Sequence, residues 1–297
     1  MYEQIAANRR RSVLLIAGAV LLLAAVGWAI GAWLGSGPAG LVAATVVAGL
    51  MALGSYRYGD RVVLASARAR EVSPEEEPRL HNIVEGLAIA AGIPKPRVYV
   101  IPERAPNAFA TGRDPAHASV AVTRGLLETM NRVELEGVVA HELAHIVDRD
   151  VLVGTIVATL VGAVVLLSEL FLRASLWGGY GGGGRRRGGE PLALLAIPFL
   201  LLAPLAAQVV RFGVSRQREF LADAQGALLT RYPPGLASAL RKIASARDVP
   251  MRASHAATAH LWLSQPSRFE GERTGWLERL FSTHPPIEER IRRLEEM

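Results

Sequence analysis

The pentapeptide HELAH holds two histidines and a glutamate at a spacing that suits a metal site. On a helix, His141 and His145 lie one turn apart and point the same way, so their imidazoles can bind one zinc ion. Glu142 lies beside them and can take a proton from a metal-bound water as that water attacks a carbonyl group. The alternative is a surface helix with two histidines, because a five-residue pattern also arises by chance.

A catalytic zinc site needs a third protein ligand and keeps a fourth position open. The metzincin extension of the motif requires glycine at position 148 and histidine at position 151, where this chain has Asp148 and Val151. The chain has no cysteine, so the third ligand must be a histidine, aspartate or glutamate from elsewhere. The lack of cysteine also excludes disulfides and a thiol nucleophile.

The segment SRQREFLADAQG offers a pair of carboxylates for this purpose. Glu219 and Asp223 are four residues apart, so on a helix they share one face. One carboxylate can bind zinc, and the other can accept the free imidazole N–H of a histidine ligand and orient it. The alternative is an exposed acidic pair beside arginines.

Four apolar runs are each about as long as the roughly 20 residues of a membrane-spanning helix. They cover residues 13–34, 37–56, 151–172 and 191–210, and Glu169 is the single charged residue in them. Buried core helices are the alternative, but four such runs are too many for one small core. The first run is also longer than the apolar region of a cleaved signal peptide. The sequence therefore predicts two transmembrane hairpins.

Arginines predict the orientation of these hairpins, since positive charge favours the cytoplasmic side. Residues 9–11 are arginines before the first run, and four more follow the second run, whereas the link at 35–38 is uncharged; the four are Arg57, Arg61, Arg68 and Arg70. The bulk of the chain is thus expected in the cytoplasm. The link of the second hairpin also carries arginines, which opposes full spanning. A re-entrant or surface-lying pair is the alternative, and full spanning is favoured.

The chain divides into four parts on this basis. Residues 1–56 form the N-terminal transmembrane hairpin, and residues 57–150 form the first part of a catalytic domain. Residues 151–210 form the second apolar hairpin with its link rich in glycine and arginine, and residues 211–297 complete the catalytic domain. If the HELAH helix continues unbroken into the third run, its rise of about 1.5 Å per residue puts the histidines at the membrane surface. Asp148, Arg149 and Asp150 would then mark the water boundary.

Between the first hairpin and HELAH, the pattern predicts one helix and several strands. Ser73 is expected to cap a helix with Pro74 in its first turn, and Gly92 is expected to end it. Residues 97–101 and 119–123 are expected to be strands. A further strand is expected near residues 107–111, and either it or its partner at 119–123 is expected to offer an exposed edge to an extended substrate. The candidate substrate-binding residues are Asn107, Ala108, Phe109 and Ala110. The alternative for that strand is a paired position inside the sheet.

Several motifs together resemble the HtpX-like membrane zinc metalloproteases. They are HELAH, the apolar hairpin after it, SRQREFLADA, STHPPIEERI, PNAFATG at 106–112 and VTRGLLE at 122–128. Type-1 CAAX prenyl proteases are more distant relatives. The resemblance covers nearly the whole chain. It implies an α+β, mainly helical fold of the gluzincin type, with two transmembrane hairpins and a small β-sheet in the catalytic domain.

The resemblance also implies roles for individual residues. His141, His145 and Glu219 would hold one Zn²⁺ per chain, with Glu142 as general base and Asp223 orienting a ligand. His284 and Arg290 become candidates for stabilising the tetrahedral oxyanion, because cationic or neutral donors suit that charge. The histidines without an expected role are His81, His117, His255 and His260.

The implied activity is endoproteolysis of membrane proteins, linked to quality control and stress response in the bacterial inner membrane. The expected partners are polypeptide substrates and the lipid bilayer, which the net charge of +6 near the apolar runs also suits. No pattern of basic and aromatic residues suggests nucleic acid. The alternatives are a non-catalytic zinc-binding scaffold and a CAAX-type protease. A structural zinc site usually needs cysteine, and this chain has none, so catalysis is favoured.

Overall fold

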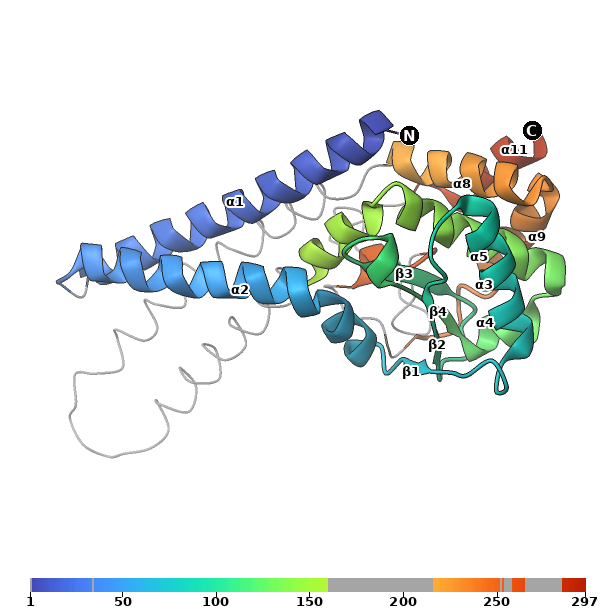
Figure 1. Cartoon of the computed structure of the whole chain (residues 1–297), viewed down its shortest axis with the longest axis horizontal. Helices are drawn as coiled ribbons and strands as arrows, with labels where there is room; N and C mark the ends of the chain where they lie inside the picture. The colour runs from blue at the N-terminus through green and yellow to red at the C-terminus, as the bar shows by residue number, and fades with distance from the viewer. Residues whose placement is uncertain (1, 34, 160–215, 252, 254–257, 265–284) are drawn as a thin grey trace.

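The computed structural model describes residues 2–33, 35–159, 216–251, 253, 258–264 and 285–297. Two long helices extend from a body in which further helices cover a small sheet (Figure 1). The fold is therefore mainly helical with a small mixed sheet, as predicted. The first elements are α1 (Tyr2–Trp33), α2 (Gly37–Ser66), β1 (Arg70–Glu71), α3 (Pro78–Ala91), β2 (Arg97–Ile101), β3 (Ala108–Gly112), η1 (Pro115–His117) and β4 (Ala118–Thr123). The remainder are α4 (Arg124–Thr129), α5 (Arg132–Val147), α8 (Arg216–Thr230), α9 (Pro233–Ser245), η2 (Ala259–Leu261) and α11 (Ile287–Glu295).

The sheet has the strand order β1-β2-β4-β3. The β2 and β4 strands are parallel, whereas β1 pairs with β2 and β3 pairs with β4 in antiparallel fashion. Because side chains alternate along a strand, Val120 and Val122 face one apolar core and Ala121 faces another. β3 lies at an edge of the sheet, as predicted for the substrate strand, yet its side chains are buried.

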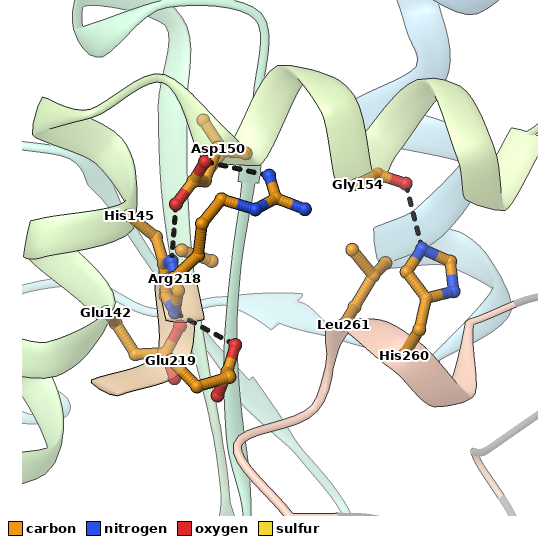
Figure 2. A pocket seen from close by; sticks show the side chains of 10 residues that line it. Glu142, His145, Asp150, Gly154, Arg218, Glu219, His260 and Leu261 are labelled. Atoms are coloured by element: carbon orange, nitrogen blue, oxygen red, sulfur yellow. Dashed lines mark hydrogen bonds and ion pairs between the residues drawn. The ribbon is translucent and has the colours of Figure 1, made fainter. Parts of the chain in front are cut away.

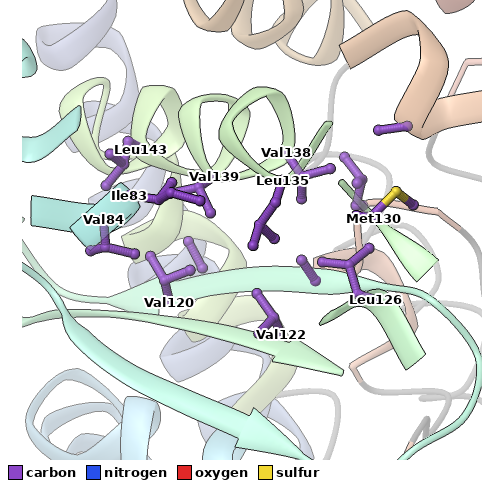
Figure 3. Close-up of a cluster of buried hydrophobic side chains, with 14 of the residues drawn as sticks. Ile83, Val84, Val120, Val122, Leu126, Met130, Leu135, Val138, Val139 and Leu143 are labelled. Atoms are coloured by element: carbon purple, nitrogen blue, oxygen red, sulfur yellow. The ribbon is translucent and has the colours of Figure 1, made fainter. Parts of the chain in front are cut away.

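Helix α5, which carries HELAH, runs through the larger core. Its residues Leu135, Val138, Val139 and Leu143 pack between β4 and helix α3 (Figure 3). The start of α5 is fixed by a capping box, in which the Asn131 side chain accepts from the Glu134 N–H and the Glu134 carboxylate accepts from the Asn131 N–H. A helix packed on its apolar side and capped at its start holds the histidines in fixed positions.

Helices α1 and α2 form an antiparallel hairpin, and both of its free ends lie at the body (Figure 1). Among the described residues, α2 is the one helix long and apolar enough to cross a membrane, with a mean hydropathy of 1.7. Its large side chains are mostly exposed, including Val42, Val46 and Leu50. The predicted second hairpin falls almost wholly outside the described residues, so it stays a prediction.

The start of α3 differs from the prediction. The helix begins at Pro78 with Glu77 before it, and residues 73–77 form a turn in which the Glu77 N–H donates to the Ser73 carbonyl. The reason is Pro78, which has no N–H to donate and disfavours a helical residue before it. Glu77 accordingly has φ −133° and ψ 64°. The predicted end at Gly92 is confirmed, since Gly92 has the left-handed φ of 68°.

The HELAH helix does not continue unbroken through residues 148–150, so the condition for the depth estimate is not met. Helix α5 ends at Val147, and Arg149 takes a left-handed φ of 60° before a new helix starts at Asp150 and runs to Thr159. A left-handed residue other than glycine costs of order 1–3 kcal/mol, so surrounding contacts must hold it. Asp148 and Asp150 are buried rather than solvated. They therefore do not mark a water boundary.

Candidate metal centre

Helix α5 directs both HELAH histidines toward helix α8. Their Nε2 atoms are 3.2 Å apart, and the two rings meet edge to face. The side chain of His141 is buried, whereas that of His145 keeps 16% of its surface exposed. The predicted shared face of the helix is thus confirmed.

Glu219 on α8 brings the third candidate ligand to these histidines. Its carboxylate oxygens lie 3.8 Å from His141 Nε2 and 3.6 Å from His145 Nε2. Ligand atoms about 2.0–2.1 Å from a tetrahedral zinc ion are roughly 3.3 Å from one another. The separations of 3.2–3.8 Å are close to that value, so the three side chains fit a metal ion of this size.

Close packing of α8 on α5 makes this arrangement possible. A Cβ atom at Gly226 would lie 3.0 Å from the backbone nitrogen of His141. A larger side chain at position 226 would push α8 away from the histidines. The glycine is therefore part of what brings Glu219 within reach.

Asp223 lies behind His141, on the side away from the cluster. One of its oxygens is 2.9 Å from His141 Nδ1, which leaves Nε2 directed at Glu219 and His145. Arg290 donates to both oxygens of Asp223, at 2.8 and 2.7 Å. Burial alone raises the pKa of Asp223, but the Arg290 charge and these hydrogen bonds outweigh it and lower the pKa to about 2. Asp223 is therefore ionised and suited to orient the imidazole.

The environments of the two histidines differ in charge. Burial lowers the pKa of His141 to about 4, so this ring is neutral and able to bind a cation. Burial also acts to lower the pKa of His145, but its hydrogen bond to Asp150 and the nearby carboxylates raise it to about 9. Metal binding must then displace a proton from His145, which makes metal affinity weaker at low pH.

Glu142 lines a cavity of about 50 Å³ together with His145 and Glu219 (Figure 2). That volume exceeds the roughly 10–15 Å³ that one water molecule requires. Burial raises the pKa of Glu142 to about 7, while a hydrogen bond from the Ala110 backbone opposes the rise. A carboxylate with a pKa near the working pH, beside a water-sized space, suits a general base.

Asp150 is a functional candidate that the sequence did not reveal. Its Oδ2 atom lies 3.2 Å from His145 Nδ1 (Figure 2). Asp223 has the same relation to His141 Nδ1. An acidic residue five positions after a histidine is not on the same helical face, so spacing gave no signal. The turn at Arg149 brings it back to the ring.

The other predicted site residues lie in different surroundings. Arg290 is buried, and besides binding Asp223 it donates to the Leu263 carbonyl at 3.0 Å. Its oxyanion role stays a prediction, and His284 lies outside the described residues.

Of the unassigned histidines, His81 contacts the Val72 carbonyl and His117 pairs with Asp114. His260 lines the cavity and contacts the Gly154 carbonyl, and His255 is outside the described residues.

The predicted substrate strand is partly engaged by other groups. The Asn107 carbonyl accepts from the Thr123 N–H, so the backbone groups of Ala108 and Ala110 point away from β4. The Ala108 carbonyl accepts from the Leu263 N–H at 2.8 Å, and the Asn107 side chain donates to the Ser264 carbonyl. The Phe109 ring packs against Trp262. Ala110 is the member of the four that lines the cavity.

Comparison with known proteins assigns the family. A family model described as peptidase family M48 matches residues 74–297, which is more than half of the chain. The chain belongs to peptidase family M48. The matched region includes all three candidate metal ligands and Glu142.

Relatives of this M48 peptidase match it over nearly its full length. A protein described as "Protease HtpX homolog" from Thermoanaerobacter pseudethanolicus is 47% identical over 100% of this chain and 98% of its own. A protein of the same description from Pyrococcus furiosus is 48% identical over 97% of this chain and 95% of its own. A third, from Tropheryma whipplei strain Twist, is 45% identical over 100% of this chain and 98% of its own. The predicted HtpX-like resemblance is confirmed, and the chain is a metalloendopeptidase.

A solved structure shares the fold of this M48 peptidase. Ste24p of S. mikatae has a TM-score of 0.50 and 18% sequence identity, covering 99% of this chain and 67% of that one. At this identity the likeness concerns the fold alone. It supports the mainly helical architecture in which a small sheet lies beside the HELAH helix.

The raised pKa of Glu142 predicts how the rate of this M48 peptidase depends on pH. The base form exists above the pKa, so kcat/KM should fall as pH falls below about 7. A bound cation favours the charged carboxylate, so it moves this fall in kcat/KM to lower pH. A pH profile of kcat/KM, with metal content measured at each pH, tests the expectation. A rate that stays unchanged from pH 8 down to about 4, the ordinary range of a glutamate, with metal retained would exclude Glu142 as the titrating base.

Proposed function

We propose that this M48 peptidase is a zinc-dependent endopeptidase of the bacterial inner membrane. It cleaves membrane-associated or misfolded membrane proteins near the cytoplasmic face. The observation that carries the catalytic part is the cluster of His141, His145 and Glu219 with Glu142 beside it. Family membership favours this interpretation over a non-catalytic scaffold.

In this proposal His141, His145 and Glu219 hold the zinc ion. When bound, the ion acidifies a water molecule and polarises the scissile carbonyl. Glu142 accepts the proton from that water as it attacks, and then donates it to the leaving amine nitrogen. Asp223 and Asp150 keep the two imidazoles in the tautomer that leaves each Nε2 free.

The substrate is proposed to lie along the N-terminal part of β3, next to the cavity. The predicted residues Asn107, Ala108, Phe109 and Ala110 form this region, and Ala110 reaches the cavity beside Glu142. Since the Ala108 carbonyl accepts from Leu263 and the Ala110 N–H donates to Glu142, pairing with an extended substrate centres on the Ala110 carbonyl. Backbone pairing gives affinity with little demand on side-chain sequence, which suits unfolded substrates.

Exposed apolar surface supports the membrane location. Many large apolar side chains of α2 are exposed, and soluble monomers rarely expose large apolar patches. Arg57 and Arg61 are exposed near the end of α2 that meets the body. Positive charge at that end favours a cytoplasmic position for the catalytic part.

Metal removal tests the proposed function directly. The full chain in detergent should cleave unfolded casein, lose that cleavage on dialysis against a chelator, and regain it with about one equivalent of Zn²⁺ per chain. Mg²⁺ should not restore it, because nitrogen ligands disfavour that ion. Cleavage that survives complete metal removal would overturn the proposal. Restoration by another transition metal alone would overturn the assignment of zinc.

A further inference from the structure

The two histidines are held in matching ways, but from different parts of the chain. His141 faces Asp223, which is paired with Arg290 from α11. His145 faces Asp150, which is paired with Arg218 from α8 at 2.8 Å (Figure 2). Each imidazole thus has an aspartate at Nδ1, and each aspartate has an arginine.

The group formed by His145, Asp150 and Arg218 includes one more residue, which comes from helix α1. Asn8 on α1 donates its amide hydrogens to Asp150 Oδ1 at 2.6 Å and to the Asp148 carbonyl at 2.8 Å. The side chain is buried, with 3% of its surface exposed. A buried amide with both hydrogens engaged is well placed to fix the position of its acceptors.

Both acceptors lie at the break between two helices. Asp148 and Asp150 flank Arg149, whose left-handed φ of 60° reverses the chain. The Asp148 carbonyl is at the end of α5, where backbone carbonyls lack partners within the helix. Asn8 therefore joins the end of α5 to the start of the next helix, and it fixes the turn that directs Asp150 at His145.

Apolar packing places α1 at this turn. Ile16 and Ala19 of α1 pack against Leu152 and Ile156 of the helix that begins at Asp150. The contact continues from Asn8 for several turns along α1. Asn8 precedes residues 74–297, the region that matches the M48 family model.

We propose that α1 is a structural part of the metal centre, because Asn8 holds Asp150 where it orients His145. This inference rests on the metal site of the proposed function. It assigns two positioning residues. Asp150 contacts His145 directly, and Asn8 acts through Asp150. It also makes the metal affinity of the chain depend on how α1 is seated against the body.

The test compares variants of the full chain in detergent. Asn8→Leu keeps the size of the side chain and removes its donors, and Asp150→Asn keeps the size and removes the charge. Ser12→Ala is the matched control, since Ser12 lies one turn further along α1, is equally buried, and its hydroxyl has no hydrogen-bond partner among the described residues. Zinc affinity is measured by competition with a chromophoric chelator, and kcat is measured in zinc buffers.

Replacing groups that orient a metal ligand typically costs 10–100-fold in metal affinity. We expect Asp150→Asn to lie within that range and Asn8→Leu near its lower end, about tenfold. Ser12→Ala should bind zinc as the parent does. The cleavage activity of Asn8→Leu should recover at saturating buffered zinc, with kcat close to that of the parent. Because zinc also stabilises the folded state, recovery at saturating zinc is interpreted together with the thermal unfolding of the metal-free variants.

Three results would overturn the inference. They are unchanged zinc affinity in Asn8→Leu, unchanged affinity in Asp150→Asn, or an equal loss in Ser12→Ala. Thermal unfolding of the metal-free variants identifies any failure to fold. If Asn8→Leu does not fold, Asn8→Ala is measured in its place, because it removes the same donors without placing a branched apolar group beside Asp150. A parent chain that binds no zinc would refute the proposed function itself, which is a different outcome.

Discussion

The Glu142→Gln variant is expected to lose peptide-bond cleavage while keeping its metal. The loss in kcat/KM should be about 10²–10⁴-fold, the usual contribution of a general base. Glutamine has the shape of glutamate but cannot take the proton of the attacking water. Glu142 is not among the three clustered ligand atoms, so zinc stoichiometry should stay at that of the parent.

Two further measurements make this prediction decisive. Glu136→Gln is the matched control, because Glu136 lies on the same helix and pairs with Arg132 at the surface. It should cleave as the parent does. The Glu142→Gln substitution should also leave the metal-free protein at least as stable at pH 8, since burial disfavours the charged carboxylate that it replaces. Full activity in Glu142→Gln would remove Glu142 from the general-base role.

Glu219→Gln and Asp223→Asn are expected to differ sharply in zinc binding. Glu219 faces both Nε2 atoms, so its replacement should lower zinc affinity by more than about 100-fold and abolish cleavage. Asp223 faces Nδ1 of His141, so its replacement should cost about 10–100-fold and leave residual activity at saturating zinc. The amides keep the size of each side chain and change only charge and donor pattern.

Competition with a chelator and metal analysis of the purified chain measure both effects. Leu228→Ala is a suitable control on α8, because Leu228 is exposed on the same helix. The opposite order of affinities would mean that Asp223 is the ligand and Glu219 the orienting group. Equal retention of zinc in both variants would exclude α8 as the source of the third ligand.

The sequence was informative wherever the chemistry depends on one helix. The four-residue spacings of His141 with His145 and of Glu219 with Asp223 place each pair on one helical face, whatever else the chain does. Capping and strand patterns likewise predicted β2, β3, β4 and the end of α3 at Gly92. These features are set by backbone geometry over a few residues.

Spacing could not show which carboxylate faces the histidines. Glu219 and Asp223 share a face, and the packing of Gly226 on the backbone at His141 decides which one meets the Nε2 atoms. Arg290 was predicted near an oxyanion, but its contacts with Asp223 come from the way α11 docks. Such contacts join residues far apart in sequence, and local patterns carry no information about them.

The segment from Asp148 to Asp150 shows most clearly what local sequence determines and what tertiary packing determines. In the sequence it is a charged boundary between a site and a membrane span, and three charges in a row predict solvent exposure. In the structure Asp150 is buried, because Arg218 from α8 and Asn8 from α1 supply the charge and the hydrogen bonds that burial requires. Residue types and their spacing were enough to identify the candidate ligands and their helical faces. Which buried charges have partners depends on tertiary packing, because those partners lie 68 and 142 residues away along the chain.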